Sequence, residues 1–216
     1  MKKFISFIAG LFLLCGTAQA QTAPVQIVGK ETQNKSLQGV LGIDISGVGI
    51  SLTDGLDIAA EDAFSAITLS AGVKIMDRIA LTGFYQFSSE EDKTTYAYSY
   101  YLSTFGNYKT TTSFKAYGVD ASLYLPVSEK FNFIASAGLG YYDFTLDEEF
   151  NSMGSFYSSS SSEDHIGARL GIGAEVKLND RIALSGNLRY VLFDYDDDFD
   201  YVEDLAEFGL GIKFYF

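Results

Sequence analysis

The end of the chain alternates between apolar and polar residues with a period of two. Phe208, Leu210, Ile212, Phe214 and Phe216 share one parity, and Glu207, Gly209, Gly211, Lys213 and Tyr215 share the other. Successive side chains of a β-strand point to opposite faces. The pattern therefore predicts a strand with one apolar, aromatic face and one polar face.

Seven earlier segments show the same alternation. In the first, Leu37, Leu41, Ile43 and Ile45 oppose Gln38, Gly42, Asp44 and Ser46. Phe84 and Ile134 are exceptions, because each places an apolar side chain on the polar parity. The apolar stretches run about 9–11 residues, the length that a tilted strand needs to cross a membrane.

The links between these segments alternate in length. Three are short and polar, at 76–78, 126–130 and 179–181, and four are long and polar, at about 51–63, 88–112, 146–164 and 194–204. Short turns at one end and long loops at the other are typical of outer-membrane barrels. We predict an all-β fold, an eight-stranded antiparallel transmembrane up-and-down β-barrel over residues 36–216, with 21–35 as a periplasmic N-terminal lead-in.

The start of the chain has the features of a signal peptide over residues 1–20. Lys2 and Lys3 precede an apolar stretch at 4–15, and Ala18-Gln19-Ala20 forms an A-x-A cleavage site. Export, glycines on the polar face and aromatics at the strand ends favour an apolar face turned to lipid. We expect the protein in the cell outer membrane, with both termini periplasmic and the long loops extracellular.

The charge of the chain excludes one class of partner. The formal net charge is −13, and −15 without Lys2 and Lys3, since the leader has no acidic residue. So acidic a chain repels nucleic acid. Cys15, the only cysteine, lies in the leader, so we expect no disulfide in the mature protein, and no residue pattern predicts a cofactor.

Aromatic residues gather at the strand ends on the apolar face. We predict girdles at the two membrane interfaces, where an aromatic ring with one wet edge is most stable. The outer girdle comprises Phe87, Tyr117, Tyr141, Tyr190 and Phe208, and the inner one Phe131, Phe133, Phe214 and Phe216.

Charged residues collect on the inward parity. They are Asp44, Lys74, Asp120, Arg169, Glu175, Lys177, Arg189, Glu207 and Lys213. Buried charges persist only when paired. We predict a salt-bridge network that plugs the barrel, with Arg169, Arg189, Glu207 and Asp120 at its centre. The alternative is a gated or leaky pore.

The long links carry the candidate surface contacts. Tyr96, Tyr98, Tyr100 and Tyr101 are expected to extend the third strand as a hairpin that turns near 105–107, and the run Ser158–Ser162 is expected to be a flexible loop tip. Asp196, Asp197, Asp198 and Asp200 form an acidic cluster that lacks the EF-hand glycine and closing glutamate, so no metal site is predicted. Bridging to lipopolysaccharide phosphates through divalent ions remains a hypothesis.

A short sequence repeat lies 103 residues apart. Residues 73–83 match residues 176–186, which places strands two and three on strands six and seven. This suits a barrel built from two similar halves. The match is also explained by two similar solutions to the same tight polar turn.

These features together resemble the small outer-membrane barrels of the OmpA/OmpX type, the outer-membrane β-barrel or porin-like family. The resemblance covers about 36–216. It implies that the last strand, with Phe208, Leu210, Ile212, Phe214 and Phe216, is read by the barrel assembly machinery, and we expect no periplasmic peptidoglycan-binding domain.

The chain also resembles, in its architecture, some outer-membrane barrels that are enzymes. Lipid A deacylases and palmitoyltransferases use a His and a Ser at the external rim. His165, with Ser160, Ser161, Ser162 and Glu163 nearby, is the one candidate, but Gly167 replaces the serine of the deacylase His-x-Ser motif. A lipid A-modifying enzyme is therefore a remote alternative.

We expect a monomeric, non-enzymatic barrel for envelope structure and for surface contact or adhesion through its long loops. Its expected partners are outer-membrane lipid, lipopolysaccharide, the assembly machinery and a surface ligand of unknown identity. A narrow or gated porin-like channel for small solutes is the alternative from another functional class.

Overall fold

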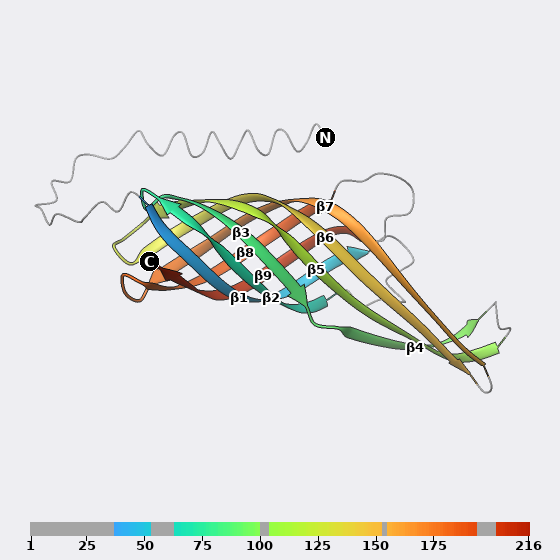
Figure 1. The fold of residues 1–216 in the computed structure, drawn as a ribbon. Coiled ribbons are helices and arrows are strands. Elements are labelled where there is room, and N and C mark those ends of the chain that lie inside the picture. The colour runs from blue at the N-terminus through green and yellow to red at the C-terminus, as the bar shows by residue number, and fades with distance from the viewer. Residues whose placement is uncertain (1–36, 53–62, 100–103, 153–154, 194–201) are drawn as a thin grey trace, which may run out of the picture. The chain divides into compact units, whose positions relative to one another are not determined.

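The computed structural model describes residues 37–52, 63–99, 104–152, 155–193 and 202–216. The expected signal peptide and lead-in lie outside these residues. All strands belong to one compact unit, Lys35–Phe216 (Figure 1). They are β1 (Leu37–Leu52), β2 (Ala63–Ile75), β3 (Ile79–Ser88), β4 (Glu91–Ser99), β5 (Thr104–Pro126), β6 (Phe131–Ser152), β7 (Ser155–Lys177), β8 (Ile182–Phe193) and β9 (Val202–Tyr215). No helix among the described residues is long and apolar enough to cross a membrane.

Eight of the strands pair in a closed ring. The antiparallel order β3-β2-β1-β9-β8-β7-β6-β5 is completed by pairing of β5 with β3, from Ile79↔Leu123 to Phe87↔Lys115. Each strand of the ring therefore has a neighbour on both sides, which leaves no exposed edge within the barrel wall. The predicted fold class, an antiparallel up-and-down all-β barrel, is confirmed.

The ninth strand arises because the third predicted strand is broken by a bulge. Three residues of the β3–β4 junction, 88–90, lie opposite two residues of β5, 113–114, so the register shifts by one. At this point Ser89 N–H donates to Ser65 O of β2, and Phe114 N–H donates to Ser88 Oγ. Beyond this point β4 pairs with β5 and with no other described strand, because the pairing of β2 with β3 stops at Ala66↔Ser88.

The link at 88–112, where the third strand was expected to extend as a hairpin, does form a hairpin of β4 and β5, and the link at 146–164, predicted as a loop, is also largely β-sheet. β4 pairs with β5 up to Ser99↔Thr104, and β6 pairs with β7 up to Ser152↔Ser155. Residues 105–107, where the hairpin was expected to turn, belong to β5. The run Ser158–Ser162 is part of β7 and not a loop tip. These segments have polar residues on both faces, which made them look like loops in the sequence.

β4 and the outer parts of β5, β6 and β7 form a four-stranded sheet that continues beyond the barrel (Figure 1). We call it the protruding sheet and define it as residues 91–99, 104–113, 145–152 and 155–163. At about 3.3 Å per residue, its strands extend roughly 30 Å past the barrel wall.

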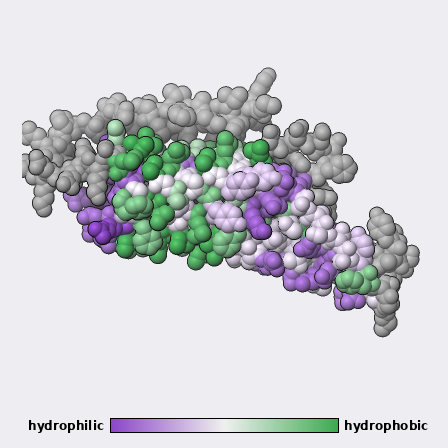
Figure 2. Space-filling view, in the orientation of Figure 1, coloured by the Kyte–Doolittle hydropathy of each residue, from purple (hydrophilic) through white to green (hydrophobic). Residues whose placement is uncertain are grey.

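The side chains follow the predicted parity around the ring. In β1, for example, odd residues from Leu41 to Ile45 are exposed, whereas Gly42, Asp44 and Ser46 are buried. Figure 2 shows the apolar side chains gathered over the barrel, with hydrophilic side chains on the protruding sheet. The two parity exceptions, Phe84 and Ile134, are each 5 % exposed and point into the barrel.

The two copies of the sequence repeat fold into equivalent hairpins with different turns. Residues 73–83 form the β2–β3 hairpin, and 176–186 form the β7–β8 hairpin. Met76 and Asp77 have φ angles of 51° and 57°, a left-handed turn that matches the twist of the strands. In the second copy Asn179 Oδ1 instead accepts from the N–H groups of Arg181 and Ile182. The shared feature is therefore the strand pairing and not the turn conformation.

Candidate functional site

The middle of the barrel holds a buried ion-pair network. Arg169 of β7 lies between two carboxylates, with Nη1 3.3 Å from Asp120 Oδ2 of β5 and Nη2 3.0 Å from Glu207 Oε2 of β9. Arg189 of β8 approaches Glu207 Oε1 at 2.8 Å. The guanidinium of Arg169 lies over the ring of Phe84 of β3, with its Cζ 4.2 Å from the ring centroid. The structure thus brings together the four residues expected at the centre of the network.

The buried carboxylate of Asp44 is bound by uncharged hydrogen-bond donors. Asp44 of β1 accepts from Asn187 Nδ2 at 3.2 Å and from Ser185 Oγ at 3.5 Å, and it is 2 % exposed. Glycine makes room for this carboxylate, since a Cβ at Gly211 would lie 2.1 Å from Asp44 Oδ1. Asp44 therefore lies in the barrel interior as expected, held by hydrogen bonds.

A second polar layer lies toward the short turns. Lys213 Nζ is 3.1 Å from Tyr124 Oη and 3.8 Å from Glu175 Oε2. Glu175 also accepts hydrogen bonds from Asn132 Nδ2, at 3.0 Å, and from the hydroxyl of Tyr215. Its carboxylate, which is fully buried, is thus surrounded by donors from β6 and β9.

Lys74 reaches the same layer, and no carboxylate of the described residues lies at hydrogen-bond distance from it. Its Nζ lies over the ring of Tyr124, 3.8 Å from the centroid, and 5.0 Å from that of Tyr215. The ring faces compensate in part for the loss of water around a buried ammonium group. Lys177 lies half-buried close enough to Lys74 to interact with it electrostatically.

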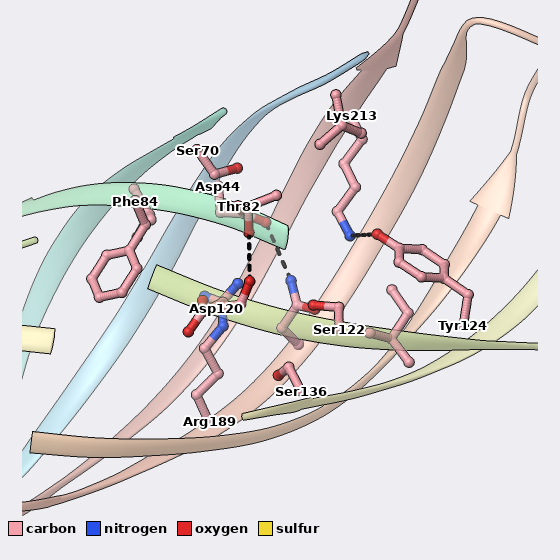
Figure 3. A pocket seen from close by; sticks show the side chains of 14 residues that line it. Asp44, Ser70, Thr82, Phe84, Asp120, Ser122, Tyr124, Ser136, Arg189 and Lys213 are labelled. Carbon is pink, nitrogen blue, oxygen red and sulfur yellow. Dashed lines mark hydrogen bonds between the residues drawn. The ribbon is translucent and has the colours of Figure 1, made fainter. Parts of the chain in front are cut away.

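A small cavity separates the two polar layers. Its walls include Asp44, Thr82, Asp120, Arg189 and Lys213, and Figure 3 shows these side chains converging from different strands. The cavity offers about 30 Å³, room for only a few water molecules. The interior at this level is polar and nearly filled.

Toward the long-loop end, the interior is an apolar cluster that the sequence analysis missed. It contains Val48, Ile50, Phe64, Ala66, Phe84, Phe114, Ala116, Tyr142, Phe144, Val191, Phe193 and Leu205, each at most 7 % exposed. Phe193 contacts the rings of Tyr142 at 5.1 Å and Phe144 at 5.8 Å, edge to face. The signal was present in the sequence as apolar residues on the inward parity near the strand ends.

The predicted girdle residues all lie on the outward face. Tyr117 and Tyr141 pack against each other at 5.3 Å between ring centroids, and Phe131 packs edge to face on Phe133 at 5.1 Å. The exposed large apolar residues include Phe87, Tyr117, Phe133, Tyr190, Phe208, Phe214 and Phe216. Phe208, Leu210, Ile212 and Phe214 form the outward face of β9, and Phe216 follows it directly; these five residues are the predicted assembly signal.

The predicted loop contacts fall partly within the protruding sheet. Tyr96 is exposed and stacks on Phe105, with ring centroids 6.0 Å apart, and Tyr98 pairs with Phe105 in the strand register. Tyr100 and Tyr101 lie outside the described residues, as do the four aspartates at 196, 197, 198 and 200.

A surface ion pair and a tyrosine hydrogen bond mark the two faces of the protruding sheet. Lys109 Nζ is 2.8 Å from Asp92 Oδ2, and Thr111 Oγ1 donates to Asp92 Oδ1 at 2.6 Å. These bonds hold the pKa of Asp92 below its usual value. On the other face, burial and then the carboxylate of Glu148 raise the pKa of Tyr108.

The candidate catalytic histidine lies in the apolar cluster. His165 is 6 % exposed, and its ring is 5.3 Å from that of Phe193. Its Nε2 lies 3.6 Å from Glu163 Oε1. Ser160 and Ser162 have the opposite parity in β7 and so lie on the other face of the sheet. Ser161 shares the face of His165 but lies four residues along the strand, about 13 Å away at 3.3 Å per residue, and its Oγ donates to Leu146 O. None of these three serines therefore lies beside His165.

Solved structures with similar folds are outer-membrane barrels. Neisserial surface protein A has a TM-score of 0.59 at 15% identity, over 82% of this chain and 97% of that one. The attachment invasion locus protein Ail of Yersinia pestis has a TM-score of 0.50 at 14% identity, over 83% and 98%. OprG of Pseudomonas aeruginosa has a TM-score of 0.52 at 14% identity, over 85% and 97%. A search of curated proteins gives no match.

The family assignment is direct. A model described as the outer membrane protein beta-barrel domain matches residues 7–216. Together with the closed ring of strands and the apolar outer face, this shows that the chain belongs to the outer-membrane protein β-barrel family.

Proposed function

We propose that this protein is a closed barrel whose protruding sheet makes contacts at the cell surface. The observation that carries the proposal is the contrast between a filled interior and strands that continue beyond the apolar band. The short turns and both termini of the chain face the periplasm in this proposal, so the sheet is extracellular. The apolar outer face contacts lipid and lipopolysaccharide, and β9 is the segment read by the assembly machinery.

Two features of the interior argue against the alternative, a channel for small solutes. Arg169 and Glu207 cross the barrel with paired charges, and the apolar cluster above them packs aromatic rings edge to face. Water and ions would have to pass both layers. Attachment is a role that this fold serves elsewhere, as the name of the attachment invasion locus protein states for that protein.

Single-channel conductance tests the closed interior. The refolded mature protein is placed in a planar bilayer beside the Arg169→Ala variant, and we expect silence from the unmodified protein. Steady channels in that protein, enlarged by the substitution, would make the network a gate and would overturn the proposal in favour of a pore.

Removal of the protruding sheet tests the surface role. A variant that lacks 91–112 and 147–160, rejoined by short Asn-Gly turns, keeps the pairings that close the ring. We expect it to reach the outer membrane at normal levels, while cells that carry it lose the attachment to protein-coated surfaces conferred by the full protein. Equal attachment by both proteins would contradict a contact role for the sheet.

A further inference from the structure

We propose that the edge of β7 in the protruding sheet, which has no neighbour among the described strands, pairs with the same edge of a second copy held in a facing membrane. This inference rests on the proposed function, since it names a partner for the protruding sheet. It comes from three observations on β7. They are the direction of its backbone groups, the absence of edge protection and the lack of charged residues in the serine-rich segment 155–162.

The backbone of β7 shows which groups are free. Lys177 N–H donates to Lys130 O, next to β6, whereas Leu178 N–H donates to Ile182 O, next to β8. The register between β6 and β7 runs without a shift from Phe131↔Val176 to Ser152↔Ser155. Odd residues of β7 therefore direct their N–H and C=O groups to β6, and even residues direct theirs to the opposite side.

In the protruding sheet, that opposite side has no neighbour among the described strands. β8 pairs with β7 only as far as Phe193↔Gly167. Phe156, Ser158, Ser160 and Ser162 therefore present a row of backbone donors and acceptors at the edge. Such a row is a template for the addition of another strand.

This edge lacks the features that normally block strand addition. Exposed edges are usually protected by lysine, proline, a bulge or an inward charge. Residues 155–162 read Ser-Phe-Tyr-Ser-Ser-Ser-Ser-Ser, with no charge and no proline, and their register has no bulge. The other free edge, β4, contains Glu91, Asp92 and Lys93 and is protected in the usual way.

The neutral segment favours a second copy of the same chain as the occupant. Two mature chains, each with a formal net charge of −15 once Lys2 and Lys3 are removed from the total of −13, repel each other over most of their surface. An antiparallel pairing centred on Ser159 places Ser158 opposite Ser160 of the second copy, and Phe156 opposite Ser162. The whole paired segment, 156–162, then contains no charged residue on either strand.

Antiparallel pairing also fixes the relation of the two membranes. Paired in this way, the two β7 strands run in opposite directions, so the two barrels lie at opposite ends of the shared sheet. Copies side by side in one membrane have β7 strands that run in the same direction and cannot form this contact. The pairing therefore joins two facing membranes, while each barrel remains a monomer within its own.

Aggregation of phospholipid vesicles that carry the refolded mature protein tests this pairing. Light scattering reports contact between vesicles, and vesicles without protein set the baseline. We expect vesicles with the unmodified protein to aggregate. Failure of these vesicles to aggregate, with the protein folded and its protruding sheet accessible to added protease, would overturn the inference.

A charge-exchange experiment identifies the edge. One variant carries Ser158→Lys and Ser160→Lys, and a second carries Ser158→Asp and Ser160→Asp. Like charges on facing strands should slow aggregation of either variant alone by roughly tenfold or more. An equal mixture of the two kinds of vesicle should aggregate again, because each lysine then faces an aspartate. No recovery in the mixture would contradict pairing through this edge.

A matched control separates this inference from the proposed function. Thr94→Lys adds one lysine to the edge of β4, and we expect aggregation at the unmodified rate. If the unmodified vesicles stay dispersed but cells still need the protruding sheet to attach to protein-coated surfaces, the self-pairing is wrong and the contact function stands. If attachment is also independent of the sheet, both are wrong.

Discussion

The barrel wall and the protruding sheet are built from the same strands, but they are stabilised in different ways. Within the ring, β5, β6 and β7 have a neighbour on each side and enclose a paired, packed interior. Beyond it, β6 is the one neighbour of β7 among the described strands, and both faces of the sheet carry polar side chains. The same backbone thus changes from a closed wall to an open edge within one strand.

Substitutions in the two regions should therefore affect different properties of the protein. A buried group in the ring has partners that become unpaired or lose packing when it is removed. A side chain on the protruding sheet can exchange its partner for water. We therefore expect large losses of stability from interior changes, and small ones from changes on the sheet, whose effects should appear in binding.

The largest effect is expected from Arg169→Ala. The substitution leaves Asp120 without its only ion-pair partner among the described residues, and leaves Glu207 with Arg189 alone. A buried charge stripped of its partner destabilises by about 4 kcal/mol. Urea unfolding of the protein in lipid vesicles measures the loss. Arg189→Ala should cost clearly less, because Glu207 keeps Arg169, and equal losses from the two changes would show that the network does not work through Arg169.

The next effect is expected from Phe193→Ala in the apolar cluster. The ring contacts Tyr142, Phe144 and His165, so its removal opens a cavity among them. Loss of a buried phenylalanine costs about 3 kcal/mol in free energy of unfolding. The same urea titration measures it, with exposed Phe105→Ala on the protruding sheet as the control. A loss at Phe105 as large as that at Phe193 would remove the distinction between the two regions.

The alternation of apolar and polar residues was enough to predict the closed ring of eight strands. Alternation placed Asp120, Arg169 and Glu207 on the inward face and Leu41 and Phe214 on the outward face. The closed pairing of eight strands follows from the same rule and the alternating links. Which cation meets which carboxylate depends on the stagger between strands that are far apart in the chain, and alternation within each strand does not encode it.

Alternation of the tyrosines from Tyr96 predicted the β4 hairpin, but the β6–β7 part of the protruding sheet and the apolar cluster could not be predicted from alternation, for physical reasons. Outside the membrane both faces of a strand are wet, so the run Ser158–Ser162 has no apolar parity and looks like a loop. Inside the barrel, Phe64, Phe114 and Phe193 come from different strands, and each is a single residue in its own segment. Their contact appears only once the ring is closed.

A glycine pair tests how tightly the interior is packed. A Cβ at Gly211 would meet Asp44 Oδ1 at 2.1 Å, whereas a Cβ at Gly47 meets nothing within 4 Å. We expect Gly211→Ala to destabilise by about 2 kcal/mol, the scale of overpacking in a filled core. Gly47→Ala should be neutral or slightly stabilising in the same unfolding assay. Tolerance of alanine at 211 would mean that the Asp44 layer has room to move, which would favour a pore.

The smallest effect is expected from the ion pair on the protruding sheet. The hydrogen bond from Lys109 holds the pKa of Asp92 below its ordinary value of 3.8, so this pair contributes above that value and is lost as the pH falls through the lowered pKa. Solvent screens so exposed a pair, and its loss should leave the unfolding curve almost unchanged. An NMR titration of the Asp92 carboxyl in the Lys109→Met variant should show its pKa moving up toward 3.8, with Lys93→Met as the control. A matching fall in barrel stability would mean that the protruding sheet and the ring unfold together, and the two regions would then be one cooperative unit.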